Sequence, residues 1–187
     1  MRTVQTARFT LKAEGKVAKV PLHSAEGQLT RQGNAQGSLQ IDQAGSLVEL
    51  AFVLVGDTAY IKGATGGYQK VPLAIAAAVY DPSAILDPDR GAAKLLGTAR
   101  NARTEAREPV DGQDAYRVTA TFGRDALADL LPGIDQDITG TVWIGADRPV
   151  LVKARFPVPA PDGGKGGIVT VTFTDFDAAA HITPPTG

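Results

Sequence analysis

Alternation of apolar and polar residues at every second position constrains the fold of this chain most. In "RFTLKAE", Phe9, Leu11 and Ala13 fall on one side of an extended strand, and charged or hydroxyl residues fall on the other. "GQLTR", "GSLQID" and "IVTVTFTDF" repeat the pattern between glycine-rich spacers. Such alternation is typical of an antiparallel sheet with one face in a core and one face in water.

Short turn signals divide the alternating segments into hairpins. Gly56-Asp57 lies between two apolar strands, and Asp111-Gly112, the strongest hairpin signal in the chain, lies between two more. A third hairpin turns near Ala146-Asp147. Counted this way, the chain contains about 10–11 strands.

Short helical segments interrupt the strand pattern in two places. "VPLAIAAAVY" is rich in alanine, and "GRDALADLLPG" combines apolar spacing with a Pro-Gly stop. Asp81 and Asp87 are each followed by a proline, which pairs a favoured N-cap with the residue best suited to the first helical position. We therefore expect short helices to start at Asp81 and at Asp87. Because the helices are clustered rather than alternating with strands, the fold class is α+β with an antiparallel sheet.

A sheet of this size cannot remain flat, so it is expected to curl or close. The helices are too few to cover its inner face tightly. We predict a curved antiparallel sheet that the short helices cover in part, with a cavity between them. No internal repeat or linker is visible, so residues 1–187 are expected to form one domain with a flexible tail at residues 180–187.

Composition and motifs exclude several classes of function. The net charge is −1 and no basic stripe stands out, which argues against nucleic acid as a partner. The absence of cysteine removes disulfides, thiolate chemistry and cysteine-based zinc sites. His23 and His181 lie far apart without H-E-x-x-H spacing, and no G-x-S-x-G or G-x-x-x-x-G-K-[ST] motif occurs. We expect no cofactor, no metal and no catalysis. Trp143 is interpreted as a core or sheet-face residue rather than a stacking platform for sugars or bases.

The order of these segments resembles the LppX/LprAFG family of mycobacterial-type, actinobacterial envelope lipoproteins. "VYDPSAILDPDRGAAKLLGTARNARTEAREPVDGQDAYRVTA" resembles the family's Tyr-Asp-Pro segment, its second helix start and the hairpin that follows. "TGTVWIGADRPVLVKARF" resembles the family's A-T-V-W-I strand and the next hairpin. "FTLKAEGKVAKVPLHSAEGQLT" and "VELAFVLVGDTAYIK" are similar to its earlier strands, so the resemblance covers nearly all of residues 7–175.

The resemblance implies a strongly bent antiparallel sheet, a half-barrel with short helices covering its concave face, similar to the lipoprotein carriers LolA and LolB. It implies that lipids or acylated glycolipids bind in an apolar cavity and are carried across the cell envelope, with an envelope transporter as a candidate partner. The family attaches to the membrane through an N-terminal lipid anchor, which residues 1–187 do not contain. The loop "PAPDGGKGGI" departs from the family pattern. The cargo, the two membranes and the oligomeric state do not follow from the sequence.

The predicted lining of the lipid-binding cavity is the inward-facing apolar set. The strands supply Phe9, Leu11, Leu39, Ile41, Leu50, Phe52, Leu54, Val118, Phe122, Val142, Ile144, Val152, Val171 and Phe173. The helical cover supplies Tyr80, Ile85, Leu95, Leu96, Leu127 and Leu131. The inward face of residues 48–55 and 141–144 is ambiguous by one register. A filled core is the main alternative, and it would make the protein an interaction or assembly module of the envelope. An esterase is the third, without a visible nucleophile–base pair.

Overall fold

The structure is a computed structural model of the chain. It describes residues 1–15, 17, 22–43, 45–77, 82–128, 130–131, 134–160 and 166–186. Within these residues, no helix is both long enough and apolar enough to span a bilayer.

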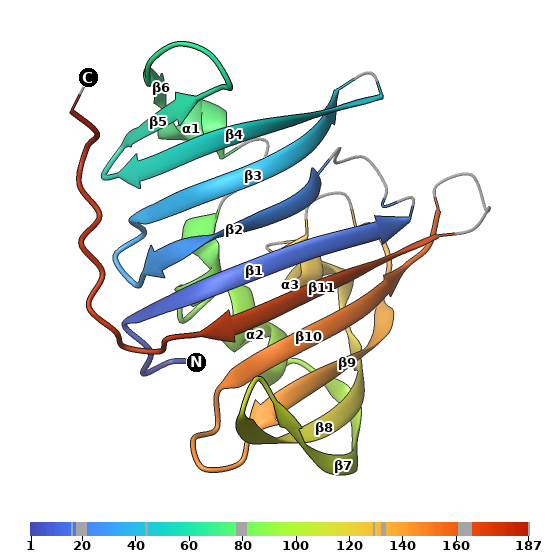
Figure 1. Cartoon of the computed structure of the whole chain (residues 1–187). Coiled ribbons are helices and arrows are strands. Elements are labelled where there is room, and N and C mark those ends of the chain that lie inside the picture. Colours follow the sequence, from blue (N-terminus) through green and yellow to red (C-terminus); the bar gives the residue numbers. More distant parts are fainter. Residues whose placement is uncertain are drawn as a thin grey trace.

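In the described part of the chain, 11 strands form one antiparallel sheet that does not close (Figure 1). The strands are β1 (Thr6–Gly15), β2 (Leu22–Thr30), β3 (Ala35–Gln43), β4 (Ser46–Val55), β5 (Thr58–Lys62), β6 (Gln69–Pro72), β7 (Arg100–Val110), β8 (Gln113–Phe122), β9 (Ile138–Gly145), β10 (Leu151–Val158) and β11 (Gly167–Thr174). Their order is β6-β5-β4-β3-β2-β1-β11-β10-β9-β8-β7. The first and last strands are therefore neighbours, and β6 and β7 are the two edges.

This strand order explains why the helices cover one face of the sheet. The helical elements are α1 (Leu73–Ala76), the 3-10 helix η1 (Pro82–Leu86), α2 (Gly91–Gly97) and α3 (Arg124–Ala128). Because β6 and β7 lie at opposite edges, the segment between them must cross the sheet, and it carries α1, η1 and α2 across one face (Figure 1). The α+β class, the bent antiparallel sheet and the helical cover are confirmed.

One predicted helix start is wrong. α2 begins at Gly91, with Arg90 at its N-cap position and no capping side chain. Asp87 instead closes a turn before the helix, because its Oδ1 accepts hydrogen bonds from the backbone N–H groups of Asp89 (2.9 Å) and Arg90 (3.1 Å). The bond from Asp89 is the main reason that the pKa of Asp87 lies below its ordinary value. Asp81 lies outside the described residues.

A pair of glycines lets two strands approach closely. Gly27 on β2 and Gly37 on β3 are register partners. A Cβ at Gly27 would lie 2.2 Å from the carbonyl oxygen of Gln36, and a Cβ at Gly37 would lie 1.9 Å from that of Glu26. These Cβ positions would be on the helix-covered face, since strand neighbours at every second residue are buried there. Only glycine therefore permits this close approach.

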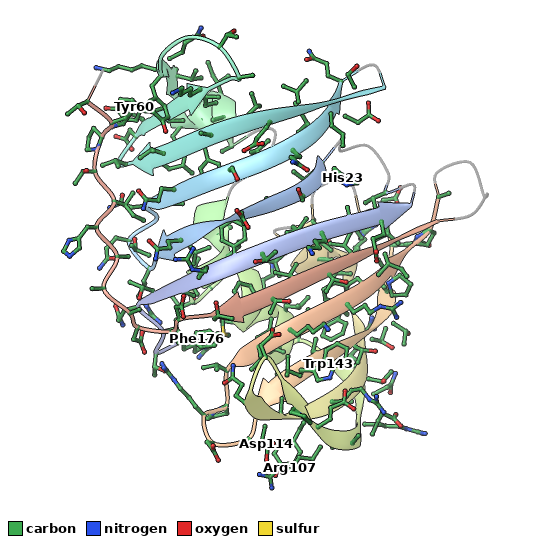
Figure 2. The ribbon with its side chains drawn as sticks, viewed as in Figure 1. His23, Tyr60, Arg107, Asp114, Trp143 and Phe176 are labelled. Carbon is green, nitrogen blue, oxygen red and sulfur yellow. The ribbon has the colours of Figure 1, made fainter. Side chains whose placement is uncertain are left out.

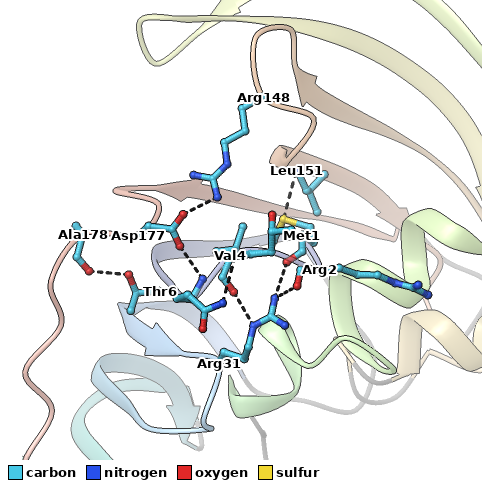
Figure 3. Close-up of polar contacts among 11 residues, drawn as sticks. Met1, Arg2, Val4, Thr6, Arg31, Arg148, Leu151, Asp177 and Ala178 are labelled. Carbon is cyan, nitrogen blue, oxygen red and sulfur yellow. Dashed lines mark hydrogen bonds and ion pairs between the residues drawn. The ribbon is translucent and has the colours of Figure 1, made fainter.

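Arg31 holds the N-terminal segment against the sheet (Figure 3). It follows β2, and its guanidinium donates hydrogen bonds to the backbone carbonyls of Val4 (2.9 Å), Met1 (3.3 Å) and Arg2. The Met1 thioether accepts a hydrogen bond from the backbone N–H of Leu151 at 3.3 Å. Hydrogen bonds to a charged donor are stronger than neutral ones, so this segment is a fixed part of the fold.

Asp177 fixes the segment that follows β11. Its carboxylate accepts hydrogen bonds from the backbone N–H of Gln5 (2.6 Å) and from Arg148 (2.5 Å) (Figure 3). Its own N–H donates to the carbonyl of Thr6 at 2.9 Å. Further on, Ile182 is buried. Flexibility of residues 180–187 stays a prediction.

Asp177→Asn is expected to lower the free energy of unfolding at neutral pH by less than about 1 kcal/mol, because its ion pair is partly exposed. The bond from Gln5, followed by that from Arg148, holds the pKa of Asp177 below its ordinary value. The stabilisation is therefore present above the unfolded pKa of about 3.9 and is lost as pH falls through the folded value. Urea unfolding at neutral pH and near pH 3 checks this. A wild-type advantage that stays constant at both pH values contradicts it, and Asp147→Asn is the control.

Candidate functional site

The interface between the helices and the concave face of the sheet is one apolar cluster. Most of the predicted lining residues meet there. Buried in it are Phe9, Leu11, Phe52, Leu54, Ile85, Leu95, Phe122, Leu127, Leu131, Val142 and Phe173. Partly buried and packed against it are Leu39, Leu96, Val118, Ile144 and Val171. The register of residues 48–55 and 141–144 is thus the predicted one.

Three predicted lining residues lie elsewhere, and a fourth is not described. Ile41 and Leu50 have the inward register but are only half-buried and lie outside the buried cluster. Tyr80 lies outside the described residues. The prediction for Val152 is wrong, because it packs in a second cluster with Val110, Ala115 and Trp143.

A β-bulge in β10 causes the displacement of Val152. Leu151 is opposite Ile144, but the next paired residue is Lys153, opposite Trp143. The extra residue reverses the alternation, so Leu151 joins the main cluster in place of Val152. Strict period-two counting from the sequence cannot reveal such a bulge.

The described residues enclose a small cavity between the two layers. It has a volume of about 20 Å³, which is room for roughly one water molecule and not for an acyl chain. The lining residues are Ile85, Leu95, Leu130, Leu131, Leu151, Ala154, Phe156, Val171 and Phe173. All nine are apolar, and the helices pack directly on the sheet around them. Leu130, Leu151, Ala154 and Phe156 were not among the predicted lining residues.

An aromatic pair fills the part of the cluster beneath β8, β9 and β10. The rings of Phe122 and Phe156 meet edge to face, with centroids 5.4 Å apart. Gly140 on β9 makes room for this arrangement, since a Cβ there would lie 2.6 Å from Cδ1 of Phe156. A T-shaped pair is a favourable aromatic geometry, so this region is a rigid part of the core.

α2 contacts the helices on either side of it in the sequence, η1 through its backbone and α3 through a lysine side chain. Gly91 has a φ of 56°, and a Cβ at this position would lie 2.0 Å from the carbonyl oxygen of Ala84 and 2.6 Å from that of Ile85. The first turn of α2 therefore packs directly against the backbone of η1. The Lys94 ammonium donates to the carbonyl of Asp125 at 3.2 Å, which joins α2 to α3. Contacts from these helices to the sheet include the apolar side chains of the main cluster.

Gly91→Ala is expected to lower the free energy of unfolding by about 2 kcal/mol, because a left-handed backbone costs alanine about 1–2 kcal/mol and the methyl group strikes η1. Thermal or urea unfolding measures the loss. Gly97→Ala is the matched control, since a Cβ there meets no atom within 4 Å. Equal stability of the two variants would show that α2 and η1 do not pack as described.

The outer, convex face of the sheet carries the second cluster around Trp143 (Figure 2). The indole Nε1 donates to Glu108 at 2.7 Å, and Arg117 pairs with the same carboxylate at 3.1 Å. The Lys153 ammonium lies 5.1 Å from the ring centre. Trp143 is 8% exposed, so its ring is packed against neighbouring side chains while its N–H is hydrogen-bonded. The interpretation as a sheet-face residue is confirmed.

The described residues do not gather metal-ligating groups. No three His, Cys, Asp or Glu residues among them are placed to hold a metal ion. His23 lies on β2 and His181 in the segment after β11, and both are exposed. The remaining ion pairs lie at the surface, such as Arg107 with Asp114 at 2.8 Å beside the β7–β8 turn (Figure 2).

Comparison with known sequences gives a match to the LppX_LprAFG lipoprotein family over residues 1–182. The lipoarabinomannan carrier protein LprG of Mycolicibacterium smegmatis is 30% identical over 188 residues, covering 98% of this chain and 78% of the relative. The protein of the same name from Mycobacterium tuberculosis is 26% identical, covering 98% of this chain and 77% of the relative.

Solved structures show the same fold. LprF from Mycobacterium bovis superposes with a TM-score of 0.82 at 24% identity, covering 100% of this chain and 91% of that chain. The lipoprotein LppX from Mycobacterium tuberculosis gives a TM-score of 0.70 at 18% identity, covering 96% of this chain and 90% of that chain. The 11-stranded bent sheet with its helical cover is therefore shared with these proteins.

Proposed function

The chain belongs to the LppX_LprAFG lipoprotein family, and from this membership we propose that it binds lipids or acylated glycolipids and carries them across the cell envelope without catalysis. The relatives named as lipoarabinomannan carriers support the class of cargo, because one of them is 30% identical over 98% of this chain. Lipoarabinomannan joins a glycan to a lipid, as its name states. A carrier for such a molecule needs an apolar site for the lipid part.

The apolar interface between the helices and the concave face is the observation that carries the proposal. Every residue that lines its small cavity is apolar. Ligand pockets usually have about 300–1,000 Å³, so at this cavity the helices must move away from the sheet to admit a lipid. We propose that η1 and α2 move together, because the backbone contact at Gly91 holds them to each other. Apolar contacts are non-directional, and acyl chains can replace them.

The same reasoning supports the setting proposed for the protein. A lipid carrier must meet a membrane to load and unload, so we propose an extracytoplasmic position in the envelope with an N-terminal lipid anchor in the natural protein. A transporter that supplies the lipid is the proposed partner.

Mass spectrometry of the purified protein tests the proposal directly. The native protein is weighed first, and then again after extraction with organic solvent. A bound lipid or glycolipid in near-stoichiometric amount is the expected result. A bare polypeptide mass, with no uptake of an added diacyl lipid, would overturn the proposal.

Hydrogen exchange tests the proposed movement. Backbone amides of η1 and α2 are expected to exchange faster than those of β1 and β11, because opening exposes the helices first. Added lipid should slow the exchange of the helices. Equal protection of helices and sheet would contradict the movement.

A protein interaction module is the second candidate function, and the small cavity favours it. The cavity that the described residues enclose leaves about 20 Å³ of free space, so the core around it is nearly filled. In that case the protein would bind its partner through its surface. Neither lipid uptake nor a lipid-dependent change in hydrogen exchange would be observed. An esterase would instead turn over a generic ester and lose that activity on substitution of one serine.

A further inference from the structure

The convex face of the sheet carries a polar groove of about 390 Å³, opposite the helices. Its polar side chains come from neighbouring strands, and one tyrosine comes from the β5–β6 connection. They are Arg8, Glu26, Gln28, Gln36, Ser38 and Tyr68. We call this feature the outer groove.

Strand register places these side chains in two adjacent rows. Arg8 is opposite Gln28, and Gln28 is opposite Gln36. In the next row, Glu26 is opposite Ser38. Side chains at directly opposed positions lie about 4.5–5.5 Å apart, so the two rows form one continuous polar strip across β1, β2 and β3.

The close glycine pair lies between the two rows. Gly27 and Gly37 both line the outer groove, and a Cβ at either position would point to the helix-covered face. The strand backbone at the two glycines therefore forms the floor between the rows.

Tyr68 forms one wall of the outer groove. Its side chain is half-buried beside Val53, which is only 7% exposed on this face. The Lys62 ammonium lies 5.9 Å from the centre of the tyrosine ring, within the range of a cation–π contact. The ring is thus held in place rather than free in solvent.

The polar groups of the strip are available to a ligand. In the part of the chain that the structure describes, the side chains of Glu26, Gln28, Gln36 and Ser38 make no hydrogen bond or ion pair with another residue. Ser24 and Gln40, on the same face nearby, do bond to each other at 3.2 Å. The Nε of Arg8 donates to the Asp175 carboxylate at 3.0 Å, and no described residue binds the two terminal amino groups of Arg8.

We propose that the outer groove binds a neutral oligosaccharide. Sugar hydroxyls donate and accept hydrogen bonds, as do glutamine amides and the serine hydroxyl, and carboxylate and guanidinium groups complete the set. The tyrosine ring offers an apolar surface to the carbon face of a sugar ring. The carboxylates of Glu26 and Asp175 balance the cations of Arg8 and Lys62 in charge, so a phosphate-rich ligand is not favoured.

The oligosaccharide can come from the glycan of a carried glycolipid or from a free polysaccharide of the envelope. The first source rests on the proposed function, and the second does not.

Titration of ¹⁵N-labelled protein with a lipid-free mannose tetrasaccharide tests the outer groove. Shifts are expected in the amides of residues 26–28, 36–38 and 68. Gln28→Ala combined with Gln36→Ala is expected to raise Kd by about tenfold or more, because several hydrogen bonds are lost. Tyr68→Ala, which lies outside the strands, is a second variant that should weaken binding. Gln113→Ala removes a similar side chain from β8 and is the control that should bind normally.

A diacyl glycolipid bearing the same glycan identifies the source. If the tetrasaccharide binds alone and the groove variants weaken it, the outer groove recognises free glycan. If only the glycolipid binds and the same variants weaken it, the outer groove holds the glycan of the cargo. If folded groove variants bind both ligands like the wild type, or if neither ligand shifts the groove amides, the inference is overturned. Failure of the proposed function differs, because a plain diacyl lipid would then not bind while the tetrasaccharide would.

Discussion

Phe122→Ala is expected to lower the free energy of unfolding by about 3–5 kcal/mol. Phe122 is 0% exposed and contacts Phe156 edge to face. Truncation removes both the burial of the ring and the aromatic contact. Gly140, which packs against Phe156, has no side chain that could move into the space left by the Phe122 ring. The site therefore relaxes little, and the full cost of the new cavity is expected.

Urea unfolding of Phe122→Ala and of a control on the same strand measures this effect. Tyr116→Ala is the control, since Tyr116 is 40% exposed and contacts Arg107 at the surface. Its loss is expected to stay below about 1 kcal/mol. A loss for Phe122→Ala as small as that of the control would mean that β8 and β10 do not share one core.

The strands and several of the hairpins could be predicted because both depend on local patterns, whereas the pairing of β1 with β11 was not predicted. Asp111 and Gly112 have φ values of 48° and 85°, the two left-handed residues that a tight hairpin needs, and they join β7 to β8. Alternation also placed Phe9, Phe52 and Phe173 correctly in the core. These signals lie within a few residues of one another and need no tertiary information.

The errors arise where tertiary context overrides a local pattern. Asp87 has the residue type of an N-cap, but its carboxylate instead bonds to the backbone of the turn that precedes α2. After this turn, Gly91 packs against the backbone of η1. Val152 fits the alternation of β10, but the bulge moves it to the convex face beside Trp143. Neither the contact of Gly91 with η1 nor the bulge in β10 has a distinct signature in the sequence.

The candidate sites differ in how visible they are from sequence. Most of the apolar residues expected at the lining fall in the cluster between helices and sheet, whereas the small size of the cavity that the described residues enclose was not predicted, because core residues and cavity residues have the same composition. The outer groove was not predicted at all. Gln28, Gln36 and Ser38 look like ordinary polar residues on a solvent-exposed face, and only the strand register brings them together.

Val171→Trp is expected to reduce lipid binding by about tenfold or more, because the indole would occupy the space that an acyl chain needs. Val171 lies near the middle of β11, opposite Leu11 and Ala154, and it lines the small cavity beneath the helices. Since the cavity is nearly filled in this structure, overpacking should also lower the free energy of unfolding by about 1–3 kcal/mol. Loss of stability alone therefore does not distinguish a lipid carrier from a filled core.

Lipid uptake distinguishes them, with Thr172→Trp as the matched control. Thr172 is the next residue on β11 and pairs with Thr10 and Lys153, so its side chain points to the convex face. Both variants and the wild type are delipidated and titrated with a fluorescent acyl lipid. The carrier function requires strong binding by the wild type and Thr172→Trp, and weak binding by Val171→Trp. Equal binding by all three would place the lipid elsewhere than between helices and sheet, whereas no binding by any of them would favour the interaction module.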